Sequence, residues 1–129
     1  MNERYLFRGK RLDNEKWMQG NLVYLDEEHV GIWSENAQIY IWVDPTTVGQ
    51  CTGLKDKNGT LIFEGDIVHC IATYDAANMV VIFEDGQFRL VLCEKYKNYV
   101  KGMGYKDIRF LEKEVIGNIH DTLGEVLAP

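Results

Sequence analysis

The stretch Thr52–Val68, TGLKDKNGTLIFEGDIV, decides the fold because it alternates apolar runs with two tight turns. Asn58-Gly59 lies between two of these runs, and Asn-Gly in that setting is the strongest short-range signal for a β-hairpin. A type I′ turn needs positive φ at both central residues, which asparagine and glycine tolerate best. The stretch therefore predicts strand, turn, short strand, second turn and strand, and it indicates a β architecture.

The glycines of this stretch are interpreted as residues that serve the shape of the turns. A phosphate cradle needs a helix N-terminus after the glycines, or a lysine followed by Ser or Thr, and here a strand follows. At the second turn, glycine supplies an unusual φ and aspartate hydrogen-bonds nearby backbone. The predicted turn residues are Gly53, Asn58, Gly59, Gly65 and Asp66.

Composition and charge limit the class of protein. The 129 residues leave room for one domain, or for one domain with a small appendage. An apolar fraction of 46% is ample for a packed core and too high for intrinsic disorder. The formal net charge of −6 lacks the global basic field that gives sequence-independent DNA affinity, so such binding would need a local basic patch.

Three cysteines, Cys51, Cys70 and Cys93, each lie inside an apolar run. Their odd number and the lack of a Cys-x-x-Cys pair disfavour both a disulfide framework and a zinc site. We therefore expect buried, reduced thiols in a reducing cytosol. The N-terminus has no signal-peptide pattern, and no apolar run approaches the roughly 18 residues that span a bilayer, so a soluble intracellular protein is expected.

Short apolar segments separated by turn residues indicate an antiparallel barrel or sandwich. Turns are expected at Tyr74–Asn78 and at Asp85-Gly86. Residues Lys95–Lys106 are expected to be irregular, and Asp107–Glu112 are expected to form a helical turn with Asp107 as its N-terminal cap. The predicted strands, outside the opening stretch, are Tyr5–Arg8, Trp17–Leu25, Val30–Trp33, Ile39–Val43, Asp66–Thr73, Met79–Glu84, Phe88–Glu94 and Val115–Ile119.

Asp44-Pro45 breaks the strand pattern, because proline has no amide proton and biases its predecessor away from helix. We place a boundary near residue 47. The predicted fold is all-β, with an N-terminal β-meander over residues 1–47 packed against a C-terminal five-stranded β-barrel over residues 48–129. Together they form one domain over about residues 5–125.

Tyr40 and Trp42 alternate with isoleucines in the run IYIWV, which is apolar on both faces. Such a strand is either buried on both sides or exposes its aromatic rings as a surface for a partner or for self-association. Both alternatives stay open at this point.

No pattern of catalytic or ligand-binding residues stands out. Glu64 with Asp66, and Glu84 with Asp85, are carboxylate pairs that could serve acid–base chemistry or a cation, but turn chemistry explains them more simply. His29, His69 and His120 have no nucleophile at a recognisable spacing, although a triad assembled in space is not excluded by sequence. We predict no catalytic residue, no metal and no cofactor.

Lysines alternate with tyrosines over Lys95–Lys106, a pattern that suits single-stranded nucleic acid because bases stack on rings and lysines meet phosphates. The acidic net charge favours instead a solvated loop whose tyrosines pack back on the domain. The residues concerned are Lys95, Tyr96, Lys97, Tyr99, Lys101, Tyr105 and Lys106.

The block Val48–Val68 resembles the signature block of the YopX family of small phage and prophage proteins. The opening Tyr5–Arg8 and the closing Val115–His120 are similar to the start and end of that family, so the resemblance covers nearly the whole chain. The resemblance does not extend to Trp33, Trp42 and the tyrosine-rich segment near residues 96–105.

This resemblance implies a β-rich fold whose second half is a small Src-homology-like barrel, a mobile-element origin and a bacterial cytoplasm. It carries no catalytic residue across, because the family has no established activity.

The leading prediction is a non-enzymatic accessory protein that binds another protein or a second copy of itself. The predicted surface combines the signature turn, Lys55, Asp56, Lys57 and Asn58, with Tyr40 and Trp42. Nucleic-acid binding through Lys95–Lys106 is the second choice. A small enzyme ranks last and would need a pocket that gathers Glu64, Asp66 and His69.

Overall fold

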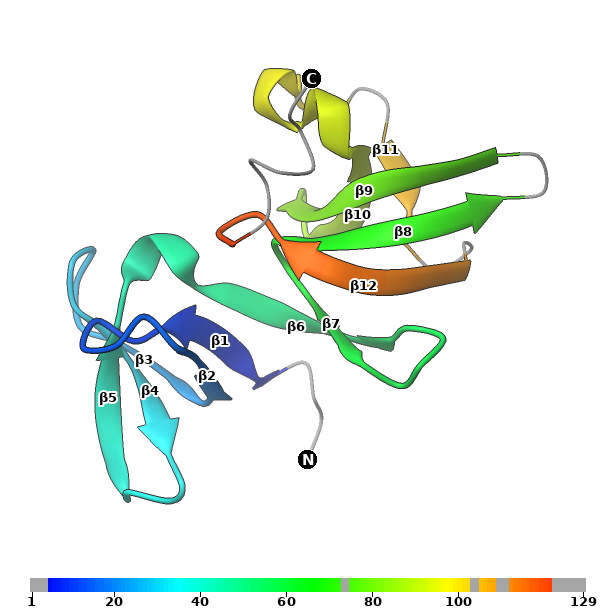
Figure 1. The fold of residues 1–129 in the computed structure, drawn as a ribbon. Coiled ribbons are helices and arrows are strands. Elements are labelled where there is room, and N and C mark those ends of the chain that lie inside the picture. The colour runs from blue at the N-terminus through cyan, green and yellow to red at the C-terminus, as the bar shows by residue number, and fades with distance from the viewer. Residues whose placement is uncertain (1–4, 73–74, 103–104, 109–111, 122–129) are drawn as a thin grey trace. The chain divides into compact units, whose positions relative to one another are not determined.

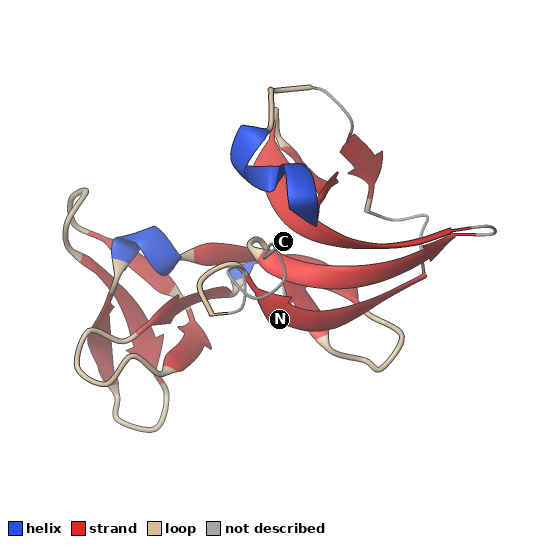
Figure 2. Ribbon diagram, turned by 45° about the horizontal axis from the view of Figure 1, so that its top comes forward, coloured by secondary structure: helices blue, strands red, loops and turns tan. Residues whose placement is uncertain are grey.

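The structure is a computed structural model that describes residues 5–72, 75–102, 105–108 and 112–121. It consists of antiparallel strands joined by turns and short 3₁₀ helices, which confirms the all-β prediction (Figures 1 and 2). The chain divides into two compact units, Met1–Gly53 and Leu54–Pro129. None of the helices in the described ranges has the length and apolar character needed to cross a membrane.

The first unit contains two groups of strands. One sheet has the order β3-β4-β5, and the other begins β2-β1-β6 and ends on β7 (Leu61–Phe63), because β6 carries the chain across the unit boundary. The elements of the unit are β1 (Phe7–Lys10), β2 (Trp17–Gly20), β3 (Leu22–Tyr24), β4 (Val30–Ser34), β5 (Ile39–Val43), η2 (Pro45–Thr47) and β6 (Gly49–Lys55).

The predicted single strand Trp17–Leu25 is wrong, because the chain changes sheets after Gly20. β2 pairs with β1, whereas β3 pairs with β4. The Asn21 carbonyl accepts a hydrogen bond from the Trp33 amide at 2.9 Å and so starts the second pairing. A Cβ at Gly20 would lie 2.6 Å from the Trp33 carbonyl oxygen, so only glycine allows the backbones to come this close.

The core of the first unit lies on one face of β4 and β5. Val30, Ile32 and Val43 are almost fully buried there, and half-buried apolar residues pack against them. The break predicted at Asp44-Pro45 is confirmed, since Asp44 Oδ1 accepts from the Thr46 amide at 3.0 Å and caps η2.

The second unit contains a five-stranded antiparallel sheet of order β11-β10-β9-β8-β12. Within the described ranges β11 and β12 are its two edges, so the sheet is open and the expected closed barrel is not found. The elements are β8 (Asp66–Ala72), β9 (Asp75–Glu84), β10 (Gln87–Leu92), η3 (Cys93–Asn98), β11 (Tyr105–Asp107) and β12 (Glu112–Asn118).

The central strands of this sheet are buried on both faces. Alternate residues of β8, β9 and β10 enter one cluster with Ile62 and Ile108, while Ile67, Val80 and Cys93 form a second. Cys51, Cys70 and Cys93 are buried and are not in disulfide bonds, as predicted. Burial raises the pKa of the Cys70 and Cys93 thiols, which disfavours a reactive thiolate at either position.

The two Xaa-Gly turns differ in type. Asp85 and Gly86 both have positive φ, 51° and 78°, as the predicted type I′ hairpin requires. At Asn58-Gly59 only Gly59 is positive, at 83°, so the type I′ prediction is wrong there. The Asp56 amide bonds the Thr60 carbonyl around a three-residue loop, in which glycine takes the left-handed position after the turn.

Three further local predictions are wrong. Residues Asp75–Asn78 continue β9 rather than turning, since Asp75 pairs directly with Ala72 of β8. Asp107 ends β11 instead of capping a helical turn, and residues 109–111 of that prediction lie outside the described ranges. The strand expected over Phe88–Glu94 stops at Leu92, and η3 begins at Cys93 and runs on to Asn98, within the segment expected to be irregular.

Substitution of Gly20 tests the sheet-to-sheet crossing. We expect Gly20→Ala to lower the free energy of unfolding by about 1–3 kcal/mol, because the new methyl group must displace backbone. Urea denaturation followed by fluorescence measures the change. Gln19→Ala, at the exposed neighbouring position, is the control and should cost less than about 0.5 kcal/mol. An equal loss of stability in the two variants would contradict the close approach of the Gly20 and Trp33 backbones.

Candidate functional site

The sheet β3-β4-β5 is apolar on both of its faces. One face belongs to the core of the first unit. On the other, Trp33 pairs with Tyr40, Gly31 pairs with Trp42, and Val23 pairs with Gly31. Because alternate residues of a strand share a face, the side chains of Val23, Trp33, Tyr40 and Trp42 form one surface, which we call the aromatic face.

The rings of the aromatic face are exposed, so the strand Ile39–Val43 is not buried on both sides. Tyr40 is 47% exposed and Trp42 is 44% exposed. The rings of Trp33 and Tyr40 meet edge to face with centroids 5.0 Å apart. The His29 ring lies 6.2 Å from that of Trp42 in a similar arrangement. These contacts hold exposed rings in place within the free protein.

Gly31 allows the side chains of this face to pack closely. A Cβ at position 31 would lie 3.2 Å from Val23 Cγ1 and 3.5 Å from Tyr40 Cβ. The missing side chain therefore leaves room for the neighbours on both sides. The sequence analysis did not single out Gly31, because its role depends on which residues of the flanking strands face it.

The signature turn of the second unit is organised around the Asp56 carboxylate. Asp56 is only 8% exposed, whereas Lys55, Lys57 and Asn58 are exposed. Its Oδ1 accepts from the amides of Asn58 at 2.8 Å and Thr60 at 3.0 Å. Its Oδ2 accepts from the Val115 amide of β12 at 2.9 Å.

Asp56 is held in its ionised form by these contacts. Desolvation raises the pKa of the carboxyl, but the three backbone hydrogen bonds and the nearby Lys57 charge outweigh it. The pKa of Asp56 therefore lies below its ordinary value. A carboxylate that binds three amides is a structural group. Among the four residues of this turn that were predicted to bind a partner, Asp56 therefore uses its side chain within the chain.

The same turn covers the outer edge of β12. The Lys57 amide donates to the Lys113 carbonyl at 3.1 Å, and Lys57 Nζ lies 3.5 Å from Glu114 Oε2. Asn58 Nδ2 donates to Glu114 Oε1 at 3.2 Å. The signature turn thus shields an edge of the sheet. This turn belongs to the second unit, whereas the aromatic face belongs to the first unit.

The second predicted turn is also tied by its aspartate. Asp66 is 1% exposed, and its Oδ2 accepts from the Phe63 amide at 2.8 Å. Gly65 has φ of 90°, which side chains with a Cβ rarely adopt. His69 lies on the opposite face of β8 from Asp66 and contacts Asn78 Oδ1 through Nδ1 at 2.9 Å.

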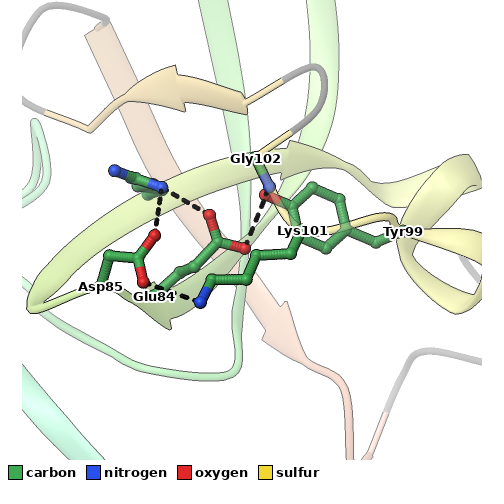
Figure 3. A network of polar contacts seen from close by, with 6 residues as sticks. Glu84, Asp85, Tyr99, Lys101 and Gly102 are labelled. Atoms are coloured by element: carbon green, nitrogen blue, oxygen red, sulfur yellow. Dashed lines mark hydrogen bonds and ion pairs between the residues drawn. The ribbon is translucent and has the colours of Figure 1, made fainter.

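A polar network that sequence reasoning missed joins the β9–β10 hairpin to the segment after η3 (Figure 3). The Arg89 guanidinium donates to Glu84, and both side chains are about one-tenth exposed. Lys101 Nζ lies 2.8 Å from Asp85 Oδ1. The Gly102 amide approaches Glu84 Oε2 at 3.3 Å and the Tyr99 hydroxyl at 3.1 Å.

The charges of this network balance one another. Lys101 lowers the pKa of Asp85, and Asp85 raises the pKa of Lys101, so both stay charged near neutral pH. Desolvation, then a hydrogen bond to Glu84, raise the pKa of Tyr99. None of these shifts prepares a proton donor or acceptor for neutral pH, and the arrangement instead pins residues 99–102 to the hairpin.

The lysine- and tyrosine-rich segment uses several of its groups within the chain. Tyr96 packs against the cluster of Ile67 and Cys93, while Tyr99 and Lys101 belong to the network. Lys95 and Lys97 are exposed on η3. The side chains of Tyr105 and Lys106 lie outside the described ones. In the described part of the chain, no group of three or more His, Cys, Asp or Glu could hold a metal ion.

A groove of about 420 Å³ lies in the first unit on the core side of the sheet β3-β4-β5, since Ser34 and Ile41 of its lining share a face with Ile32. Trp33 lines it, together with Met18 and Ile41 as apolar walls. Glu35 lines it from the β4–β5 turn, and Arg11 also reaches it. The Arg11 guanidinium already pairs with both oxygens of Asp13, at 2.9 and 2.7 Å.

Comparison with known proteins gives one family. The model of the family described as YopX protein matches residues 6–124. The crystal structure of protein yopX from Bacillus subtilis is similar, with a TM-score of 0.52 and 20% sequence identity over 93% of this chain and 94% of that chain. At this identity the likeness shows the fold alone. No curated protein matches the chain.

Neutralising Asp56 tests its role in the signature turn. We expect Asp56→Asn to lower the free energy of unfolding at pH 7 by about 1.5–3 kcal/mol, because an amide cannot accept from all three backbone donors. Since the pKa of Asp56 is lower in the folded than in the unfolded state, its contribution is complete above the unfolded pKa of about 3.9. The difference between wild type and variant should therefore shrink as pH falls below about 4.

Urea denaturation at a series of pH values measures this difference. Lys55→Ala, at the exposed neighbouring position, serves as the control and should change stability by less than about 0.5 kcal/mol at any pH. A stability difference for Asp56→Asn that stays constant down to about pH 3 would show that the carboxylate charge is not what matters.

Removing one partner of the buried ion pair tests the network. Arg89→Met leaves the Glu84 carboxylate without its cation, and we expect a loss of about 3–5 kcal/mol in the free energy of unfolding. The double variant Glu84→Leu/Arg89→Met removes both charges and should be less destabilised than Arg89→Met. If the loss in the double variant equals the sum of the losses in Arg89→Met and in the single variant Glu84→Leu, Glu84 and Arg89 are not coupled.

Proposed function

This chain belongs to the YopX family, and we propose that it acts as a non-enzymatic module that binds another protein through the aromatic face. The description of the family, YopX protein, names no reaction. The proposal rests on one observation: a sheet whose inner face is already core exposes tyrosine and tryptophan rings on its outer face.

The aromatic face has the properties of a binding surface. Tyrosine and tryptophan are the residues most enriched among those that dominate binding energy at interfaces. Because Trp33 already contacts Tyr40, and His29 contacts Trp42, little side-chain freedom is lost when a partner docks. An apolar surface of this kind on a soluble protein marks an interaction site more often than not.

Side chains rather than the backbone of β5 would carry the binding. The Trp33 amide donates to Asn21 on the β3 side, so at the pair Trp33–Tyr40 the backbone groups of Tyr40 point away from β4. Two residues further on, the Leu12 amide already donates to the Trp42 carbonyl, at 3.2 Å. The open edge is therefore too short for a partner to add a strand of ordinary length.

An enzyme and a nucleic-acid binder fit the described residues less well. Three of the carboxylates singled out by sequence, Asp66, Glu84 and Asp85, serve a turn or ion pairs within the chain. In the lysine- and tyrosine-rich segment, Tyr96 is half-buried and Lys101 is paired, which leaves fewer rings and charges for a nucleic-acid strand. Nucleic-acid binding thus stays the second choice.

We place this module in the bacterial cytoplasm as an accessory protein of a phage or prophage. The resemblance of the block Val48–Val68 to phage and prophage proteins supports this origin. Buried cysteines outside disulfide bonds, Cys51, Cys70 and Cys93, suit a reducing compartment.

Truncation of the exposed rings tests the proposed function. In a pull-down from bacterial host cells followed by mass spectrometry, the wild type should retain a protein that Tyr40→Ala/Trp42→Ala loses. The double variant should keep its fold, with a loss of no more than about 1–2 kcal/mol, because both rings are about half exposed. Circular dichroism and urea denaturation check the fold.

Tyr24→Ala/Leu25→Ala is the matched control, since both side chains are more than 60% exposed and neither belongs to the aromatic face. This control should retain the partner. If the Tyr40→Ala/Trp42→Ala variant and the control recover the same proteins as the wild type, the aromatic face does not bind a partner. Loss of the fold in the former would show that its rings belong to a core.

A further inference from the structure

Acidic residues lie at both ends of the aromatic face. The turn between β3 and β4 contains Asp26, Glu27 and Glu28, all of them exposed. The turn between β4 and β5, at the other end of the same strands, contains exposed Glu35. The Asp26 carboxylate is engaged with His29 at 2.8 Å, while Glu27 and Glu28 extend the acidic character of that end.

This distribution of charge disfavours a second copy of the chain as the partner. If two aromatic faces packed together about a two-fold axis along the strands, each acidic turn would meet its own counterpart. If the axis ran across the strands, the turn with Glu27 and Glu28 would meet Glu35. Either way acidic groups face acidic groups, and such like-charge contacts oppose association.

The acidic groups at the ends of the aromatic face are accessible to a partner. Glu35 is exposed and accepts a long hydrogen bond from Gln38 Nε2 at 3.3 Å. A lysine or arginine side chain combines an apolar stem with a cationic end, so a basic residue at the end of an apolar segment can meet such a carboxylate.

We propose that the aromatic face binds a protein segment in which apolar side chains are flanked by basic residues. The apolar side chains lie on Tyr40 and Trp42, and the basic residues at either end meet Glu28 and Glu35. This inference rests on the proposed function and specifies the chemistry of the partner.

Selection from a random 16-residue peptide library displayed on phage tests the inference. The wild-type protein should enrich peptides with an apolar centre and flanking Lys or Arg. Glu28→Lys/Glu35→Lys should enrich peptides with flanking Asp or Glu instead. Glu94→Lys/Glu112→Lys makes the same change in net charge at exposed positions of the second unit, and it should select like the wild type.

An enriched peptide and its twin with glutamate in place of each basic residue are then compared by fluorescence anisotropy. We expect the basic peptide to bind wild type at least about tenfold more tightly than its twin, with a smaller ratio at about 300 mM than at about 50 mM salt. Glu28→Lys/Glu35→Lys should reverse the preference.

Several outcomes would overturn the inference. Enriched peptides without a charge bias would contradict the need for basic flanking residues but leave the aromatic face as a binding surface. The same holds if wild type and Glu28→Lys/Glu35→Lys select the same peptides. A dimer in light scattering that Trp42→Ala dissolves would identify a second copy as the partner. Enrichment that persists in Tyr40→Ala/Trp42→Ala would contradict the proposed function as well.

Discussion

The Asp56 carboxylate joins two parts of the second unit that lie 59 residues apart in sequence. It accepts from two amides of its own turn and from the Val115 amide of β12, so the hairpin loop and the last strand become one structure. A carboxylate can bind three donors only in its ionised form and only with its oxygens fixed in direction. The local form of the turn and the shielding of the β12 edge follow from this one group.

Sequence patterns predicted those features that depend on neighbours along the chain. Alternating apolar residues located β4, β5 and most of β8, and Asp85-Gly86 gave the expected turn type because both residues accept positive φ. The Asn58-Gly59 turn differs since its geometry is also set by Asp56, whose third hydrogen-bond donor comes from a distant strand. The sheet change after Gly20 likewise depends on a carbonyl of Trp33 that no local pattern reveals.

The candidate site could be predicted only in part for a related reason. Alternation in the run IYIWV put Tyr40 and Trp42 on one face, but their exposure depends on whether anything packs over that face. Trp33 joins them through the register of β4 against β5, which sequence does not specify. The ion pair of Glu84 and Arg89 lies within one hairpin, yet its link to Gly102 needs the fold of η3 and the chain after it.

The strand Ile39–Val43 combines high β-propensity with an absence of charge and proline, the composition that promotes intermolecular β-aggregation. Two features of the first unit counter this hazard. Pairing of Arg11 with Val43 blocks one end of the strand edge, and Glu35 and Asp44 bracket the segment with charge, as gatekeeper residues do beside unavoidable apolar strands. One end of the β5 backbone is therefore shielded while the rings of Tyr40 and Trp42 stay accessible.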